Sequence, residues 1–210
     1  MQRIFFSAYF LALFSDWLKG AYIYALYSSY GYPQSQIALL YIAGFASSGL
    51  FGTFTGCLAD SLGRRNMALV FTLVYALSAL CKVRSDFLML LMGRVLGGLA
   101  TSLLCSTFES WYVQQHLITH NFPPVWLAGT FSRVTFYNGL LAITAGLLSS
   151  FLAETLQLGP LAPFLAAIPL LGLCALTIAL TWDQDDTSTN TDHHSSWVHH
   201  HIFILQTHIF

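Results

Sequence analysis

Charged residues are scarce in this sequence: they make up 8% of its 210 residues, whereas hydrophobic residues make up 56%. Because a soluble domain usually carries roughly a quarter charged residues, this composition excludes an ordinary soluble fold. The formal net charge is -1, which leaves no basic field for nucleic acid and no acidic tract. Any function must therefore depend on individual charges rather than on their sum.

Cysteine pairs and catalytic patterns are absent as well. Each of the four cysteines stands alone in an apolar stretch, so there is no CxxC metal or redox motif, and we interpret them as small apolar fillers. The sequence has no HExxH pair and no Ser-His-Asp set on a shared helix face. His116 and His120, four residues apart after the fourth apolar run, are a weak zinc candidate. We therefore expect no enzyme activity, no cofactor and no metal site.

Long apolar runs are what the sequence does have. A lipid-spanning helix needs about 20 mostly apolar residues, and short polar breaks separate six such runs. They predict an all-α membrane protein, with residues 1–182 forming a bundle of six transmembrane helices in the lipid bilayer. The first run resembles a signal peptide, but it continues without a small-x-small cleavage site, which favours a retained helix. The six predicted spans are 5–27, 36–58, 67–83, 87–113, 126–152 and 161–181.

The basic residues of the short loops indicate an orientation, because such loops are more basic on the cytoplasmic side. Arg3, Arg64 and Arg65 favour one side, and Lys82 and Arg84 favour the other. An even number of spans puts both ends on the same side. We therefore expect a multi-pass protein of the cell membrane with both termini in the cytoplasm.

Small residues recur four apart at Gly52 and Gly56 and again at Gly93 and Gly97. In lipid this spacing lets helix backbones approach closely. We interpret it as a packing signal and not as a functional one.

The character of the chain changes after Trp182. Residues 183–210 are polar and contain six of the eight histidines, and their apolar run is too short to cross a membrane. A histidine-rich tract can bind zinc or nickel. The alternative is a low-complexity end produced by alternative splicing, and this second interpretation predicts a disordered tail.

Charges inside the predicted spans are the candidate functional residues. A charge at bilayer depth costs roughly 2.5 to 3.5 kcal/mol on insertion scales, so it usually faces a protein interior or an aqueous path. Three basic residues and two acidic residues qualify. They are Asp16 and Lys19 in the first span, Arg94 and Glu109 in the fourth, and Arg133 in the fifth.

Each of these charges has a structural and a functional interpretation. Asp16 and Lys19 share a helix face and can neutralise each other, and Glu109 and Arg133 can form an ion pair if their helices are antiparallel. Arg94 has no obvious acidic partner at its depth. The surplus of positive charge favours an anion, and a guanidinium suits a tetrahedral oxyanion. We therefore predict Arg94, Arg133 and Lys19 as substrate-binding residues and Asp16 and Glu109 as charge-pair or coupling residues.

The segment between the second and third spans resembles the signature loop of the major facilitator superfamily. That loop has glycine, three residues, aspartate, a basic residue, any residue, glycine and further basic residues. Here Ser61 replaces the first basic residue. The turn residues and charges predict a charged loop over 60–66, and the resemblance implies that this loop acts as a cytoplasmic latch. The matching residues are Gly56, Asp60, Gly63, Arg64 and Arg65.

Four further stretches resemble the molybdate-anion transporter branch of that superfamily: YFLALFSDWLKGAYIYALY, FESWYVQQH, FPPVWLAGTFSR and LGPLAPFLAAIPLL. The resemblance runs from about Tyr9 to Trp182. It implies the N-terminal six-helix half of a twelve-helix carrier that takes molybdate into the cell by alternating access. It also implies an upstream extension and a second six-helix half as partner. The alternatives are a carrier for another small anion and a non-transporting isoform that pairs with or regulates the full-length carrier.

Overall fold

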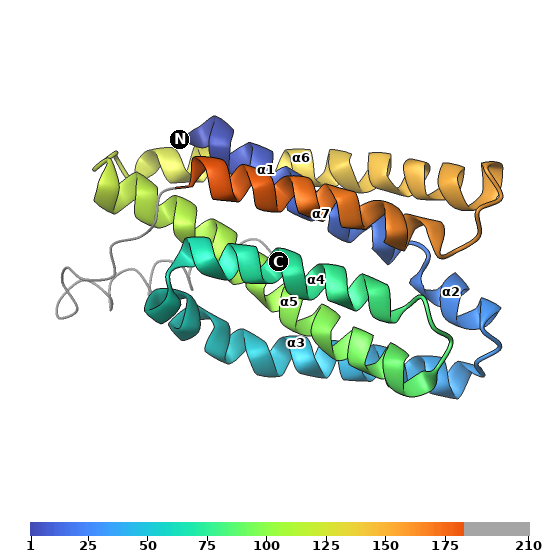
Figure 1. Cartoon of the computed structure of the whole chain (residues 1–210). Coiled ribbons are helices and arrows are strands. Elements are labelled where there is room, and N and C mark those ends of the chain that lie inside the picture. The colour runs from blue at the N-terminus through green and yellow to red at the C-terminus, as the bar shows by residue number, and fades with distance from the viewer. Residues whose placement is uncertain (183–210) are drawn as a thin grey trace.

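The computed structural model describes residues 1–182, apart from the side chains of Cys57 and Asp60. This part is helical throughout, with six long helices running along one bundle axis (Figure 1). Met1 and Trp182 lie at the same end of the bundle. The predicted tail over 183–210 lies outside the described residues. The helices are α1 (Gln2–Gly20), α2 (Ile23–Ser29), α3 (Gln34–Leu62), α4 (Arg64–Cys81), α5 (Phe87–Gln114), α6 (Val125–Ser150) and α7 (Ala162–Thr181), with π-helical turns η1 (Gln115–Thr119) and η2 (Phe151–Thr155) extending α5 and α6.

The first predicted span, 5–27, is divided into α1 and α2. The backbone leaves the helical conformation at Tyr22, which has φ of -107° and ψ of 5°. The hydroxyl of Ser149 in α6 donates a hydrogen bond of 2.7 Å to the carbonyl oxygen of Leu18. That oxygen is the acceptor which the Tyr22 N–H would use in a continuous helix. Two features thus end α1: the contact from Ser149 of α6 and the poor helix propensity of Gly20. Neither feature changes the hydropathy of the sequence, so the hydropathy pattern did not predict the break.

The predicted charged loop over 60–66 is wrong. α3 continues to Leu62 and α4 begins at Arg64, so Gly63 is the one residue between the two helices. Its φ of 84° lies in a region that side-chain-bearing residues rarely adopt. The polar residues on either side of Gly63 therefore belong to the two helices, because this one glycine is enough to reverse the direction of the chain.

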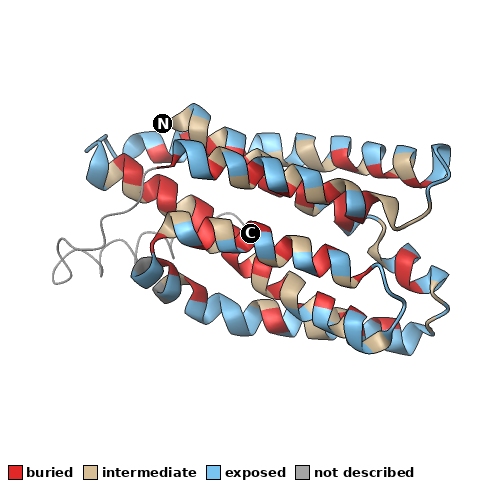
Figure 2. Ribbon diagram, in the orientation of Figure 1, coloured by how far each residue is buried: buried red, intermediate tan, exposed pale blue. Residues whose placement is uncertain are grey.

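The six long helices form two groups of three, first α1, α3 and α4 and then α5, α6 and α7. The first helix of each group packs against the second and third helices of the other group. α5 lies against α3 and α4, α1 lies against α6 and α7, and α4 and α7 contact each other. The main core fills the space between α1, α4, α5 and α7, where Phe5, Phe71, Phe108 and Leu171 are each almost fully buried. Figure 2 shows the buried residues on the inward faces of the bundle. Such a repeated packing is common in secondary transporters.

Large apolar side chains cover the outer faces of α3 and α6. Phe45 and Phe54 of α3 and Phe136 and Leu147 of α6 are all about 70% exposed. Four helices are long and apolar enough to cross a membrane: α3, α5, α6 and α7. A surface of this kind requires a lipid solvent or a protein partner, so the described chain is a helical membrane protein.

The closest helix contacts do not all occur at the predicted glycine pairs. A Cβ on Gly93 would lie 2.9 Å from Cys81 Cβ and one on Gly97 would lie 3.1 Å from Ser78 Oγ, so α4 and α5 do approach closely there. A Cβ on Gly56, however, would meet nothing within 4 Å. The tight contact of α3 with α5 lies instead at Gly44 and Gly98.

Candidate functional site

Asp16 and Lys19 of α1 both contact Tyr75 of α4. The Tyr75 hydroxyl donates a hydrogen bond to the Asp16 carboxylate, and Lys19 Nζ lies 2.7 Å from the centroid of the Tyr75 ring. Lys19 is only 4% exposed, and its buried Nζ has no hydrogen-bond partner. A buried ammonium with three unused donors is costly. The contact with the Tyr75 ring offsets part of this cost.

Lys82, which the sequence placed at the edge of the third span, is also buried. Its Nζ donates hydrogen bonds of 2.9 Å to the carbonyl and the hydroxyl of Ser78, and its own carbonyl accepts one of 2.7 Å from Tyr30. The signal for this residue was present in the sequence. Phe71, Tyr75, Ser78 and Lys82 follow one another at intervals of four, three and four, which is the spacing of one helix face.

Arg94 of α5 is half-buried against α3. Its Nε donates a hydrogen bond of 3.1 Å to the Leu40 carbonyl, and its guanidinium carbon lies 4.7 Å from the centroid of the Tyr41 ring. Gly44 makes room for it, since a Cβ there would lie 2.7 Å from an Arg94 nitrogen. The backbone contact uses one of the five guanidinium donors.

The positive charge of Lys82 opposes those of Lys19 and Arg94, and no contact joins Lys19 to Arg94 in the described part of the chain. We call Asp16, Lys19, Lys82 and Arg94 the charged cluster. It contains three cations and one carboxylate: Asp16 and Lys19 lie between α1 and α4, Lys82 lies at the end of α4, and Arg94 lies between α5 and α3. Among the described residues, no ion pair joins Asp16 to Lys19.

Glu109 and Arg133 are not paired. The Tyr9 hydroxyl donates a hydrogen bond of 3.0 Å to Glu109 Oε1, and Arg133 forms no hydrogen bond or ion pair with the described residues. Arg133 is exposed and lines a cavity of about 570 Å³ at the end of the bundle where Met1 lies. We call this the terminal cavity. It is lined by Met1, Gln2, Tyr112, His116, His120, Phe122, Val125, Trp126, Gly129, Thr130 and Arg133.

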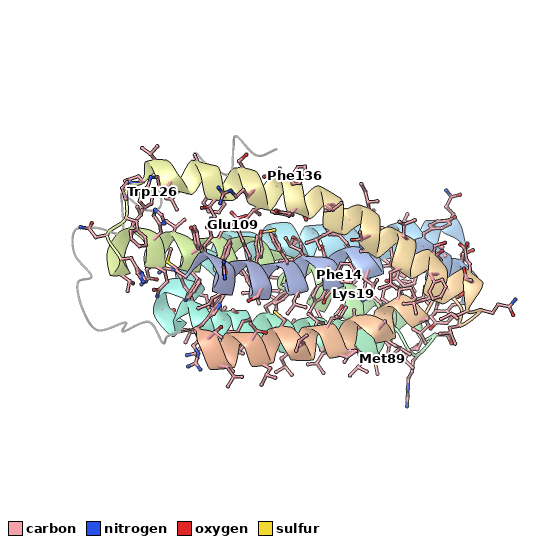
Figure 3. All side chains as sticks on the ribbon, turned by 90° about the horizontal axis from the view of Figure 1, so that it is seen from above. Phe14, Lys19, Met89, Glu109, Trp126 and Phe136 are labelled. Atoms are coloured by element: carbon pink, nitrogen blue, oxygen red, sulfur yellow. The ribbon has the colours of Figure 1, made fainter. Side chains whose placement is uncertain are left out.

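The three predicted substrate cations therefore do not share one space. Lys19 and Arg94 belong to the charged cluster, whereas Arg133 belongs to the terminal cavity. Figure 3 shows the separation along the bundle, with Lys19 far from Trp126. Residue position already indicates this division, because Lys19 lies near the end of α1 that is far from Met1, whereas Arg133 lies in the first half of α6, close to the terminal cavity.

The signature residues lie at the junction of α3 and α4. Gly63 separates the helices, Arg64 begins α4, and Arg65 Nη2 donates a hydrogen bond of 2.8 Å to the Ala179 carbonyl near the end of α7. Cationic side chains commonly bind the free carbonyls of a helix C-terminus. Arg65 thus ties α4 to α7 within the bundle.

Comparison with known proteins gives relatives over most of the chain. A "Molybdate-anion transporter" from Takifugu rubripes is 47% identical over 191 residues, which are 91% of this chain and 40% of the relative. Proteins of the same description from Danio rerio and Xenopus tropicalis are 49% and 42% identical over 88% and 90% of this chain. The chain spans about two fifths of the length of these relatives, 38% to 42%.

A family model for twelve-helix sugar transporters matches residues 1–202. The match continues beyond Trp182, where the resemblance in the sequence was expected to end. It covers nearly the whole chain and agrees with the helical bundle, the apolar surface and the signature residues at the junction of α3 and α4. The chain therefore belongs to this transporter family of the major facilitator superfamily.

Proposed function

We propose that α1 and α4 also cross the membrane, so that the chain forms a six-helix bundle with six spans. With 19 and 18 residues, they extend about 27 to 29 Å at the helical rise of about 1.5 Å per residue. This length is close to the hydrocarbon thickness of a bilayer, about 30 Å. Asp16 and the buried Lys19 lower the hydropathy of α1, and Arg64, Arg65 and Asn66 lower that of α4.

Both termini are proposed to lie in the cytoplasm of a cell-membrane protein. Arg3, Arg64 and Arg65 belong to the end of the bundle where the described chain begins and ends (Figure 1). Lys82 is buried, so Arg84 is the exposed basic residue of the opposite turn. The bias of accessible basic residues toward the terminal end supports this orientation.

The function that the geometry supports best is one half of an alternating-access carrier for a small oxyanion, with molybdate as the leading candidate. The observation that carries this proposal is Lys19, whose buried ammonium lacks a hydrogen-bond partner and is grouped with Lys82 and Arg94 against one carboxylate. An oxyanion would supply the missing acceptors and balance the surplus charge. A neutral sugar would not balance that charge, which favours an anion over the substrate class in the family description.

In this proposal Lys19, Lys82 and Arg94 attract and bind the oxyanion, and Asp16 limits the net charge of the empty site. The assignment of Asp16 and Glu109 to ion coupling stays a prediction, as does the latch role of Asp60, Arg64 and Arg65. A carrier of this type needs two bundles that move about a central site. The second bundle would cover the exposed apolar faces of α3 and α6.

The test is molybdate uptake by cells that express the chain alone or together with the second half of the Danio rerio relative. We expect no uptake by the chain alone, uptake when both halves are present, and its loss when Lys19→Met is introduced. Arg84→Gln is the matched control. Robust molybdate accumulation by a monodisperse monomer would refute the half-carrier proposal, and uptake that survives Lys19→Met would refute the site. Competition with tungstate and sulfate identifies the preferred anion.

A second proposal is that the chain binds the full-length carrier and lowers its activity. The exposed Phe45, Phe54, Phe136 and Leu147 favour it, because they offer an apolar surface for another bundle. Co-expression with the full-length relative should then reduce uptake and give co-purification of both chains. Unchanged uptake at high levels of this chain would count against it.

A further inference from the structure

The terminal cavity has the chemistry of an anion site and is distinct from the charged cluster. It lies between the first turn of α1, the end of α5 with η1, and the beginning of α6. Gln2 lies 17 residues before Lys19 on α1, which corresponds to about 25 Å at the helical rise of about 1.5 Å per residue. A ligand in the cavity therefore cannot contact the ammonium of Lys19 at the same time.

The donors in the cavity have no opposing acid. Its lining contains Arg133, His116 and His120 but no aspartate or glutamate. Arg133 makes no hydrogen bond or ion pair with the described residues, so its guanidinium fork is available. A planar fork of this kind binds tetrahedral oxyanions through two parallel hydrogen bonds.

His116 supplies an independent observation. Its Nε2 lies 3.0 Å from the carbonyl oxygen of Pro123, and a carbonyl only accepts, so Nε2 carries a proton. The side chain is 2% exposed, and its other nitrogen, Nδ1, is buried with no partner. In the ring with its proton on Nε2, Nδ1 is therefore an acceptor without a donor. The hydroxyl group of a singly protonated oxyanion such as hydrogen phosphate would supply that donor.

A polar and aromatic wall completes the site. Thr130 Oγ1 accepts a hydrogen bond of 3.0 Å from Gln2 Nε2 and lies 3.0 Å from the Tyr112 hydroxyl, which fixes the side of the cavity formed by α1, α5 and α6. Phe122 and Trp126 are 38% and 59% exposed at the rim. Exposed tryptophan at a helix end is typical of the membrane interface, where lipid headgroups lie.

We propose that the terminal cavity binds a tetrahedral oxyanion group, held by Arg133 and His116, that is either a free inorganic oxyanion or the phosphate of an anionic lipid headgroup. If the ligand is a free oxyanion, the cavity is a second binding site along a transport path. A lipid phosphate would make it a site at which the membrane composition acts on the bundle. The inference does not depend on the proposed substrate of the charged cluster.

The experiment measures binding to the purified chain in detergent, with inorganic phosphate and short-chain phosphatidylglycerol as separate probes and chloride at equal ionic strength as reference. Arg133→Gln should weaken the bound probe about tenfold or more, as expected for the loss of a charge-assisted hydrogen bond. Arg3→Gln is the matched control: it removes an exposed arginine at the same end that does not line the cavity, and it should change affinity less than about twofold.

A second variant distinguishes a loss of binding from a loss of folding. Gly129 lines the cavity, and a Cβ there would meet no heavy atom within 4 Å, so Gly129→Leu introduces an apolar side chain into the cavity from an open position. It should abolish binding while leaving the melting temperature unchanged. Binding of phosphate identifies a free oxyanion and binding of phosphatidylglycerol alone identifies a headgroup, and both support the site. Equal affinities for Arg133→Gln and Arg3→Gln, or binding of neither probe, would overturn it. Lys19→Met should leave this binding intact, which separates its outcome from that of the proposed function.

Discussion

The Tyr9 hydroxyl of α1 donates a hydrogen bond of 3.0 Å to the Glu109 carboxylate of α5. This contact joins α1 and α5 at a depth where the sequence indicated an ion pair between Glu109 and Arg133. Because a tyrosine satisfies the carboxylate, Arg133 remains free to line the terminal cavity. The Tyr9 hydroxyl thus connects Glu109 to α1 instead of to Arg133 of α6.

Removing that hydroxyl should destabilise the bundle. Tyr9→Phe leaves the half-buried Glu109 without its partner, and the expected loss is about 1 to 3 kcal/mol of unfolding free energy. Tyr24→Phe is the control, since Tyr24 is 52% exposed. Thermal unfolding of both variants in detergent measures the difference. Equal melting temperatures would show that the hydrogen bond contributes nothing.

Lys19→Met should separate function from stability. Replacing the buried ammonium with an apolar side chain of similar length removes its desolvation cost, and Asp16 keeps its hydrogen bond from Tyr75, so stability should change little. Oxyanion affinity of the charged cluster should fall about tenfold or more. Unfolding and molybdate binding are measured on the same preparation. A large loss of stability with normal binding would assign Lys19 a purely structural role.

Gly98→Ala should disrupt the contact of α3 with α5. The added Cβ would collide with Ser47 Oγ and the Gly44 carbonyl, and would lie 2.9 Å from the Ser48 nitrogen. Overpacking of this kind costs about 1 to 3 kcal/mol. Gly146→Ala in α6 is the matched control, because a Cβ there meets nothing within 4 Å. A control that melts below Gly98→Ala would contradict the packing assignment.

Gly63→Ala should be costly and Gly56→Ala should not, although both glycines belong to the signature segment. Gly63 has φ of 84°, whereas Gly56 lies inside α3 with open space around its Cα. The strain at Gly63 should cost about 1 to 3 kcal/mol. Comparing the two melting temperatures tests whether glycine is required only at the junction of α3 and α4 or at both glycine positions of the signature segment.

The sequence predicted the six long helices because apolar runs of membrane length are a strong signal. It missed the break after Gly20, which depends on a hydrogen bond from Ser149, and it placed a loop where Gly63 alone reverses the chain. Lys19 and Arg94 were predicted, but Lys82, whose charge interacts with both, was overlooked because it follows the last turn of its helix. Side-chain direction and tertiary partners are set by packing, which hydropathy does not encode.

The one-residue connection at Gly63 also constrains motion. A single extended residue spans at most about 3.6 Å, so the linker holds almost no slack. If α3 slid along its axis by one helical turn, about 5.4 Å, α4 would have to follow. Mechanically, the two helices are joined by a hinge without slack, so an axial displacement of one helix is transmitted to the other at Gly63.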